Sequence, residues 1–360
     1  MPVPSAGPDE PADAGDPSSA AHPRAHRRRG RARTVLLIVA LVLLVTAALG
    51  FVAARVTMSA YDRAVARDVL LDPDARATTP GAAVRGPLNF LLLGSDRRKS
   101  NPDMGQRSDT IIIAHITRDL DHAYLLSIPR DLLVEIPAQP DIGFPGAYTK
   151  INAAYGYGRS ARGGARLVAR TLTRLTGVRF DGAAVIDFSG LRSAVTVLGG
   201  VRMCVDVRTV SIHTGAVFEK GCRRMNSAQV LDYLRQRDSL PDGDFGRQRH
   251  QQQFIKAIAA EARRQSLLVH PIKLDRLIRS VAASLVVDIG AVSLPDLLLA
   301  LRGIDDRSLT GIRLPAYDDM IDNISYVVAE RPRAHDLFDA VRTDTLAAWA
   351  AANRSWVNRI

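Results

Sequence analysis

From residue 88 onward, short apolar runs bounded by polar turn residues alternate with longer stretches in which apolar positions recur three or four apart. Such runs predict buried strands, and such stretches predict amphipathic helices. The predicted strands are 88–93, 110–116, 124–128, 183–188, 201–207, 311–314 and 324–328. The predicted helices are 164–175, 189–198, 226–237, 245–267 and 294–301. Strands alternating with helices predict a layered α/β domain.

The chain before this domain has a different pattern. Residues 1–34 lack any apolar period and end in a cluster of arginines, which predicts a disordered basic tail. Residues 35–54 carry no charge, and a helix of that length spans about 30 Å, enough to cross a bilayer core. A cleaved signal peptide is the alternative, although its apolar stretch is normally only about 7–15 residues. We therefore expect a transmembrane helix, a stalk over 55–87, a domain over 88–345 and a C-terminal tail over 346–360.

Composition and charge narrow the class of protein. The chain has 360 residues, of which 47% are hydrophobic, so it is not a disordered polypeptide. Its 48 Lys and Arg against 37 Asp and Glu give a net charge of +11. Arginines cluster directly before the apolar segment, so the positive-inside rule places the N-terminus in the cytoplasm and the domain outside the cell. Most of the positive charge then lies outside, which argues against nucleic acid as a partner.

Cys204 and Cys222 are the two cysteines of the chain, too few for a disulfide-dense scaffold. An extracellular location favours a disulfide between them. Closing the intervening loop in this way would contribute about 3 kcal/mol in the loop-entropy model. Two unpaired buried thiols are the alternative.

Three polar clusters stand at the ends of predicted strands. The first holds Asp96, the second Arg107 and Asp109, and the third Arg130 and Asp131. Strands that pair in one sheet bring such ends together, and sites are commonly built there. Mg²⁺ prefers carboxylate oxygens and shares its shell with phosphates, which Arg grips with two donors. The clusters therefore indicate a metal-bound phosphate or pyrophosphate; unrelated turn aspartates with surface ion pairs are the alternative.

A second polar set lies later in the chain. Arg235 and Arg237 converge only if the helix that carries them ends between them. Gln251 lies about one helical turn beyond Arg247, on the same face. A solvated basic helical hairpin would explain the same spacing. The sequence lacks a P-loop, a nucleophile elbow and an HExxH zinc motif.

In this order, the clusters resemble the LytR–CpsA–Psr (LCP) family of cell-envelope proteins. The resemblance is carried by residues 89–96, 106–110, 127–131, 150–155 and 244–252, together with the Arg235/Arg237 pair. It implies a mixed sheet between helices, with an apolar pocket for a polyprenyl chain. It also implies a phosphotransferase that moves an anionic glycopolymer from a polyprenyl-pyrophosphate carrier to peptidoglycan. The acceptor would be a muramic acid 6-hydroxyl, and polyprenyl phosphate would leave.

The resemblance implies roles for individual residues as well. Asp96 and Asp109 match the positions that bind Mg²⁺ (or Mn²⁺). The positions that grip the pyrophosphate are matched by Arg107, Arg130, Arg235, Arg237 and Gln251. Asp131, Lys150 and Arg247 match recurring polar positions. Asp109 and Asp131 are the two candidates for the general base.

Three functions stay open at this point: the glycopolymer ligase, a hydrolase that uses water as acceptor, and a non-enzymatic module that binds anionic lipid or polymer. The Arg- and Ala-rich composition indicates an actinobacterial source, and hence arabinogalactan or a related wall glycan, although teichoic acid and capsule also fit. We expect a single-pass protein of the cell membrane with its catalytic domain outside. Its partners would be the lipid-linked glycan, peptidoglycan and the membrane.

Overall fold

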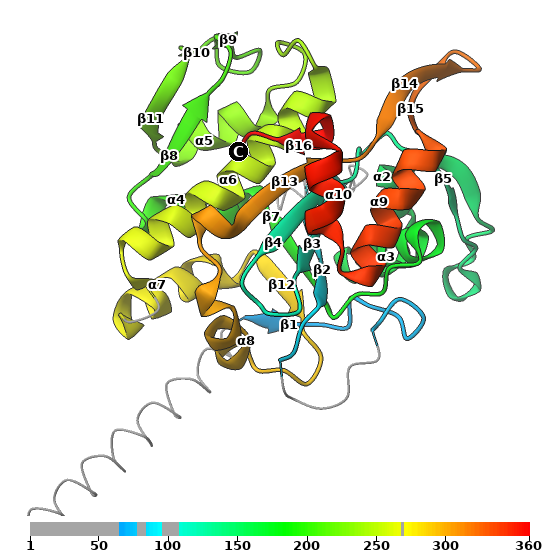
Figure 1. Ribbon diagram of the computed structural model, residues 1–360, viewed down its shortest axis with the longest axis horizontal. Coiled ribbons are helices and arrows are strands. Elements are labelled where there is room, and N and C mark those ends of the chain that lie inside the picture. The colour runs from blue at the N-terminus through cyan, green and yellow to red at the C-terminus, as the bar shows by residue number, and fades with distance from the viewer. Residues whose placement is uncertain (1–64, 78–83, 96–107, 268–269) are drawn as a thin grey trace, which may run out of the picture. The chain divides into compact units, whose positions relative to one another are not determined.

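The computed structural model describes residues 65–77, 84–95, 108–267 and 270–360. Its centre is an eight-stranded sheet of order β1-β12-β7-β2-β3-β4-β13-β16 (Figure 1). In that order the strands are Ala66–Arg67, Leu285–Asp288, Gly182–Asp187, Leu88–Ser95, Ser108–Ile116, Ala123–Ser127, Leu309–Arg313 and Val357–Asn358. The pairs β1/β12, β2/β7 and β4/β13 are parallel and the other neighbours are antiparallel. The mixed α/β fold implied by the family resemblance is confirmed.

Helices cover both faces of this sheet (Figure 1). One face carries α2 (Ile151–Tyr157), α3 (Ala161–Thr176), α9 (Arg331–Thr343) and α10 (Leu346–Ala352). The other carries α4 (Phe188–Val197), α6 (Gly243–Arg264) and α7 (Pro271–Ala282), with α5 (Ser227–Arg235) packed on α4 and α6. In β3, Ile111 and Ile113 pack with the first group, while Ile112 and Ala114 pack with Ile255 of α6. Because both faces are buried, β3 is apolar at nearly every position.

Smaller elements surround the sheet. Helix α8 spans Leu294–Ala300. Among the described residues, four two-stranded ribbons are formed by β5 (Leu133–Ile136) with β6 (Ala147–Lys150), β8 (Val201–Val205) with β11 (Gly221–Met225), β9 (Thr209–Val210) with β10 (Val217–Phe218), and β14 (Ala316–Ile321) with β15 (Ile324–Ala329). Cys204 lies directly opposite Cys222 in the β8/β11 ribbon, and a disulfide joins them. The predicted pairing is thereby confirmed, and it closes the base of the β9/β10 ribbon.

Two segments expected outside the domain pack within it. Leu70 and Leu71, placed in a stalk by the sequence, are buried in the core. Asp288 Oδ2 accepts their backbone N–H groups at 2.8 and 3.1 Å and Arg76 Nη2 at 2.6 Å. At the other end of the chain, Trp349 joins the core and β16 pairs with β13, so the C-terminal segment is part of the fold and not a tail.

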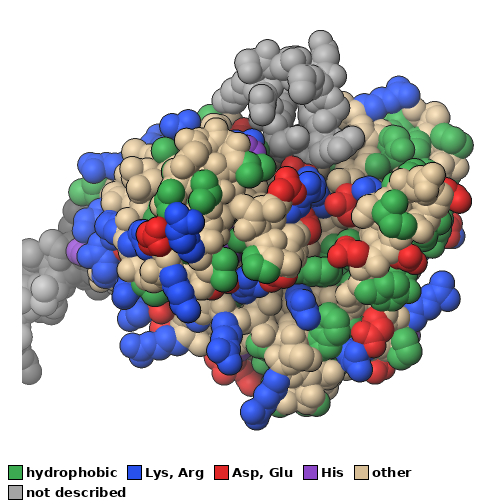
Figure 2. Space-filling view, turned by 90° about the horizontal axis from the view of Figure 1, so that it is seen from above, with side chains coloured by type: hydrophobic (Ala, Val, Ile, Leu, Met, Phe, Trp, Pro, Cys, Tyr) green, Lys and Arg blue, Asp and Glu red, His purple; other side chains and the backbone are tan. Residues whose placement is uncertain are grey.

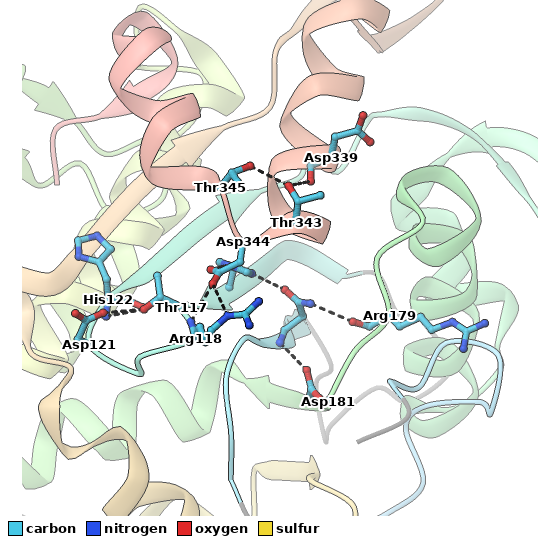
Figure 3. Close-up of polar contacts among 12 residues, drawn as sticks. Thr117, Arg118, Asp121, His122, Arg179, Asp181, Asp339, Thr343, Asp344 and Thr345 are labelled. Carbon is cyan, nitrogen blue, oxygen red and sulfur yellow. Dashed lines mark hydrogen bonds and ion pairs between the residues drawn. The ribbon is translucent and has the colours of Figure 1, made fainter. Parts of the chain in front are cut away.

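A buried polar cluster ties the end of α9 to the sheet (Figure 3). His115 of β3 is fully buried, with Nδ1 2.9 Å from Asn89 Oδ1 and Nε2 3.0 Å from Asp344 Oδ1. Asp344 caps α9 in the left-handed region, with φ at 58°, and its Oδ2 accepts the backbone N–H of Arg118 at 3.2 Å. Burial lowers the pKa of His115, although the hydrogen bond to Asp344 opposes this shift.

The predicted tail (1–34) and transmembrane segment (35–54) lie outside the described residues. All described residues belong to one unit, Met58–Ile360. None of the helices that the structure describes in this unit is long and apolar enough to cross a bilayer.

Candidate functional site

The end of β2, the start of β3 and the end of β4 meet at one edge of the sheet. Ser95 of β2 pairs with Ser108 of β3, and Ile112 of β3 pairs with Ser127 of β4. This register brings the residues beyond the strand ends together, and Arg130 Nη1 donates to Asp109 Oδ1 at 2.7 Å. Two of the three predicted clusters are therefore adjacent in space.

A pocket of about 240 Å³ opens at this edge. Its walls include six predicted site residues, namely Asp109, Arg130, Arg235, Arg237, Arg247 and Gln251. The rest of the lining consists of Gly94, Thr110, Phe188, Ile212, His213, Leu234 and Asp238. Four arginines against two aspartates give the lining a positive balance, which favours an anionic ligand.

Outside the pocket, charge is distributed differently. On the face drawn in Figure 2, Lys and Arg side chains are spread over the surface and interleaved with Asp and Glu side chains. Charged side chains of both signs therefore share this face, in contrast to the arginine-rich lining of the pocket.

The end of α5 explains how Arg235 and Arg237 reach the same pocket. Helix α5 stops at Arg235, and Gln236 is extended with ψ at 133°, so Arg237 is outside the helix. Arg235 Cζ lies 5.7 Å from the centre of the Phe188 ring, a cation–π contact that holds its guanidinium against the wall. Arg237 Nε donates to Asp238 Oδ1 at 2.7 Å, and this bond lowers the pKa of Asp238.

Arg247 is the most buried arginine of the pocket, with 6% of its surface exposed. Its Nη2 donates to the backbone carbonyl of Asp109 at 3.1 Å and lies 2.6 Å from Asp244 Oδ1. Burial lowers the pKa of Arg247, and the nearby Arg130 and Arg237 add to this, against the opposing effect of Asp244. Its Nε is buried without a hydrogen-bond acceptor among the described residues. A bound phosphate oxygen would supply that acceptor and a further negative charge beside Arg247.

Arg130 is held by carboxylates on several sides. Its Nη1 is bonded to Asp109, as described above. Its Nε lies 3.5 Å from Asp131 Oδ2 and 3.8 Å from Asp244 Oδ1. Burial lowers the pKa of Arg130, but these carboxylates outweigh it and the net shift is upward. Lys150 Nζ lies 3.1 Å from Asp131 Oδ1. Asp131 and Lys150 are absent from the lining of the described pocket, so they fix Arg130 from outside it.

A buried amide side chain, one residue beyond Gln251, fixes the position of helix α6. Gln252 is fully buried, and its Nε2 lies 2.8 Å from Leu125 O, Ser127 Oγ and Ile312 O, among which it shares its two N–H groups. Its Oε1 accepts Asn358 Nδ2 at 2.8 Å. These bonds fix α6 on β4, β13 and β16, and so point the preceding turn of the helix into the pocket.

The β9/β10 ribbon supplies another part of the pocket wall, through Ile212 and His213. Ser211 Oγ donates to Asp232 Oδ1 at 2.6 Å, and Gln236 Nε2 donates to Ser211 Oγ at 3.0 Å. The ribbon is thus fastened to α5, the helix that carries Arg235. Together with the disulfide at its base, this makes the wall a fixed part of the site.

Some residues of the site were not predicted from the sequence, and some predicted residues are not among those that the structure describes. Phe188, Ile212 and His213 line the pocket but were not predicted as site residues. The available signals were weak: Phe188 is the last residue of a predicted strand, and the other two lie between the cysteines. Asp96 and Arg107 lie outside the described residues.

The fit of the pocket to Mg²⁺ depends on Asp109. Across the described ranges, no group of three or more His, Cys, Asp or Glu side chains is arranged to hold a metal ion. Asp109 Oδ1 is engaged by Arg130, which leaves Oδ2 as a ligand atom. Mg²⁺ usually takes one or two carboxylates and completes its shell with substrate phosphates and water. Asp109 therefore fits a site completed by a phosphorylated substrate.

Comparison with known proteins identifies the family of the chain. The sequence profile of the LytR_cpsA_psr family matches residues 54–343. The cell wall biosynthesis protein LcpA of Corynebacterium glutamicum is 25% identical over 295 residues, covering 72% of this chain but only 55% of LcpA. The polyisoprenyl-teichoic acid–peptidoglycan teichoic acid transferase TagU of Oceanobacillus iheyensis is 28% identical over 243 residues, covering 67% of this chain and 71% of TagU.

A solved structure gives the same result for the fold. The structure of TagT bound to LI-WTA superposes with a TM-score of 0.59 at 22% identity, covering 77% of this chain and 99% of the TagT chain. At this identity the likeness shows a shared fold. With the profile match over most of its length, the chain belongs to the LytR_cpsA_psr family.

Proposed function

We propose that this protein is a phosphotransferase that moves an anionic cell-wall glycopolymer from a polyprenyl-pyrophosphate carrier to peptidoglycan. One observation carries the proposal: four arginines converge on a single pocket beside Asp109, and the most buried of them, Arg247, has an N–H without an acceptor in the described part of the chain. Phosphoryl transfer depends mainly on positioning and on neutralising negative charge. The relative TagU is named for a transfer of this class.

The pocket suits an amphiphilic pyrophosphate. Arg130, Arg235, Arg237 and Arg247 supply its cationic lining. The lining also has an apolar part, made by Phe188, Ile212 and Leu234. We assign the arginines to the pyrophosphate and the apolar part to the first isoprene units of the carrier.

The reaction would run as follows. The acceptor oxygen, a muramic acid 6-hydroxyl, attacks the phosphorus that carries the glycopolymer. The bond from that phosphorus to the bridging oxygen breaks, and polyprenyl phosphate leaves with the bond's electron pair. The hydroxyl proton passes to a carboxylate. Asp109 lines the pocket, whereas Asp131 is paired with Lys150 outside it, so we propose Asp109 as the base.

Asp109 also matches a metal position, and the two roles compete for its Oδ2. Mg²⁺ held there would neutralise the charge that develops on the pyrophosphate oxygens. Activity of Asp109→Asn that returns at higher Mg²⁺ concentration would assign Asp109 to the metal. Activity that stays low at every Mg²⁺ concentration would assign it to proton transfer.

The proposal is tested with the full-length protein, a lipid-linked glycopolymer and peptidoglycan. Covalent attachment of glycan to peptidoglycan supports the ligase. Release of free glycan alone would indicate hydrolysis, and donor binding without turnover would indicate a binding module.

We further propose that the pocket lies outside the cell, behind a single membrane span at residues 35–54. The lipid-linked donor and the peptidoglycan acceptor are both on that side of the membrane. A reporter fused to the C-terminus should be accessible on intact cells. A reporter detected only after lysis would contradict this topology.

A further inference from the structure

Arg313 lies on the side of the first turn of α6 that faces away from the pocket. Arg313, the last residue of β13, pairs with Ser127 of β4 and so leaves the sheet at the same edge as Arg130, three residues after Ser127. Phe245 of α6 contacts Arg313, while Arg247, two residues further on, lines the pocket. Residues two apart on a helix project about 200° from one another. The first turn of α6 therefore separates the pocket from Arg313.

The guanidinium of Arg313 is held between aromatic side chains. Its Cζ lies 4.5 Å from the ring centre of Trp356 and 5.5 Å from that of Phe245. Both rings pack against the main hydrophobic core, so they form a rigid support. Because the two rings offer no hydrogen-bond acceptor, the guanidinium N–H groups are left for a ligand.

Arg313 lacks the counter-ion that a partly buried cation normally has. Its Nε is buried without a hydrogen-bond acceptor, and no carboxylate forms an ion pair with it, in the part of the chain that the structure describes. Burial lowers the pKa of Arg313; the charge of Asp242 opposes this shift, and the charge of Arg249 adds a smaller effect in the same direction as burial. Arg333 also lies near the Trp356 ring, at 5.9 Å, but its charge is paired with Glu330. A desolvated cation without a partner is costly unless an anion binds to it.

We propose that Arg313, supported by Trp356 and Phe245, is a carboxylate-binding subsite for the acceptor peptidoglycan. This inference rests on the proposed function, which places the donor pyrophosphate on the Arg247 side of the same helical turn. Peptidoglycan carries free carboxylates on its stem peptides. The planar fork of an arginine matches a carboxylate with two parallel hydrogen bonds.

The test measures binding to the full-length protein in detergent micelles by ligand-observed NMR titration. The probes are N-acetylmuramyl dipeptide with its free carboxylate, the same compound with that carboxylate amidated, and geranyl pyrophosphate. Arg313→Gln should weaken binding of the free carboxylate about 10- to 100-fold, the usual range for losing a hydrogen bond to a charged group. Binding of the amide and of geranyl pyrophosphate should not change. The matched control, Arg354→Gln, removes an exposed arginine near Trp356 and should change none of the three.

Several results would overturn the subsite. A wild-type protein that does not distinguish the carboxylate from its amide has no such site. An Arg313→Gln variant that loses thermal stability while keeping its affinity shows that Arg313 only packs. Arg313→Lys, which retains the charge but lacks the fork, should bind the carboxylate with intermediate affinity. A wild-type protein that fails to bind geranyl pyrophosphate would instead contradict the proposed function, independently of the carboxylate result.

Discussion

Replacing Asp109 with Asn should have different effects on catalysis and on anion binding. Asp109 Oδ1 accepts Arg130 Nη1 at 2.7 Å, and 27% and 18% of the two side chains are exposed. In Asp109→Asn, Arg130 keeps Asp131 and Asp244 nearby, and the backbone carbonyl at position 109 still accepts Arg247. The substitution therefore removes one negative charge while the pocket keeps its arginines in place.

Asp109→Asn should tighten anion binding but slow turnover. Exchanging a charged acceptor for a neutral amide oxygen beside Arg130 should cost about 1–1.5 kcal/mol of folding free energy. A unit charge about 4 Å from a phosphate contributes about 4 kcal/mol at an effective dielectric constant near 20. After screening, removing this repulsion should tighten metal-free binding of geranyl pyrophosphate about 10-fold or more. Turnover should fall about 10²- to 10⁴-fold, the range for losing a general base.

Both quantities are measured on the same preparations: geranyl pyrophosphate affinity by titration in EDTA, and turnover with lipid-linked donor and peptidoglycan. Asp318→Asn, an exposed aspartate on β14, is the matched control and should change neither. Full turnover in Asp109→Asn would refute the assignment of this carboxylate. Parallel loss of affinity and turnover would also refute it, because that pattern indicates a collapsed pocket.

Three further predictions concern stability. Arg247→Met leaves Asp244 without its closest partner and should cost about 3–5 kcal/mol in urea unfolding; a loss below about 1 kcal/mol would contradict the buried pair. Cys204→Ser should lower the free energy of unfolding by about 3 kcal/mol in oxidising buffer, with the difference from wild type vanishing under reductant; two alkyl adducts on unreduced wild-type protein would argue against the disulfide. Burial lowers the pKa of His115 and of His122 below 6.5, so below that pH the unfolded chain binds more protons than the folded one. Stability should be fully present above about pH 6.5 and fall as pH drops below it, with a smaller fall in His115→Gln; wild-type urea midpoints that rise on acidification would refute this.

The sequence predicted the central strands well, because each is buried on both faces and is a continuous apolar run. It failed where the signal was short or the partner distant. The apolar positions 69–71 are too few to indicate a core segment, and Leu70 and Leu71 are held in the core by Asp288, far along the chain. Strand β16 has two residues and exists through its pairing with β13. Helix α9 has a polar average composition and carries Pro332 in its first turn, so its apolar stripe was not predicted.

The same division holds for the site. Asp109 and Arg130 were predictable together because they flank neighbouring strands, and Arg235 with Arg237 because their spacing requires a helix end. Ile212 and His213 were not, since the bond between Ser211 and Asp232 brings their ribbon to the pocket. Periodicity carries no information about such a contact.

The central claim is that the phosphorus bearing the glycopolymer is transferred to a peptidoglycan hydroxyl. The most direct measurement incubates the full-length protein in vesicles with a radiolabelled lipid-linked glycopolymer and peptidoglycan, digests the product with muramidase, and analyses it by mass spectrometry. We predict a phosphodiester between the glycopolymer and a muramic acid 6-oxygen, formed in equal amount with released polyprenyl phosphate. Polyprenyl phosphate released together with free glycan phosphate, and without any muramic acid phosphodiester, would contradict the account.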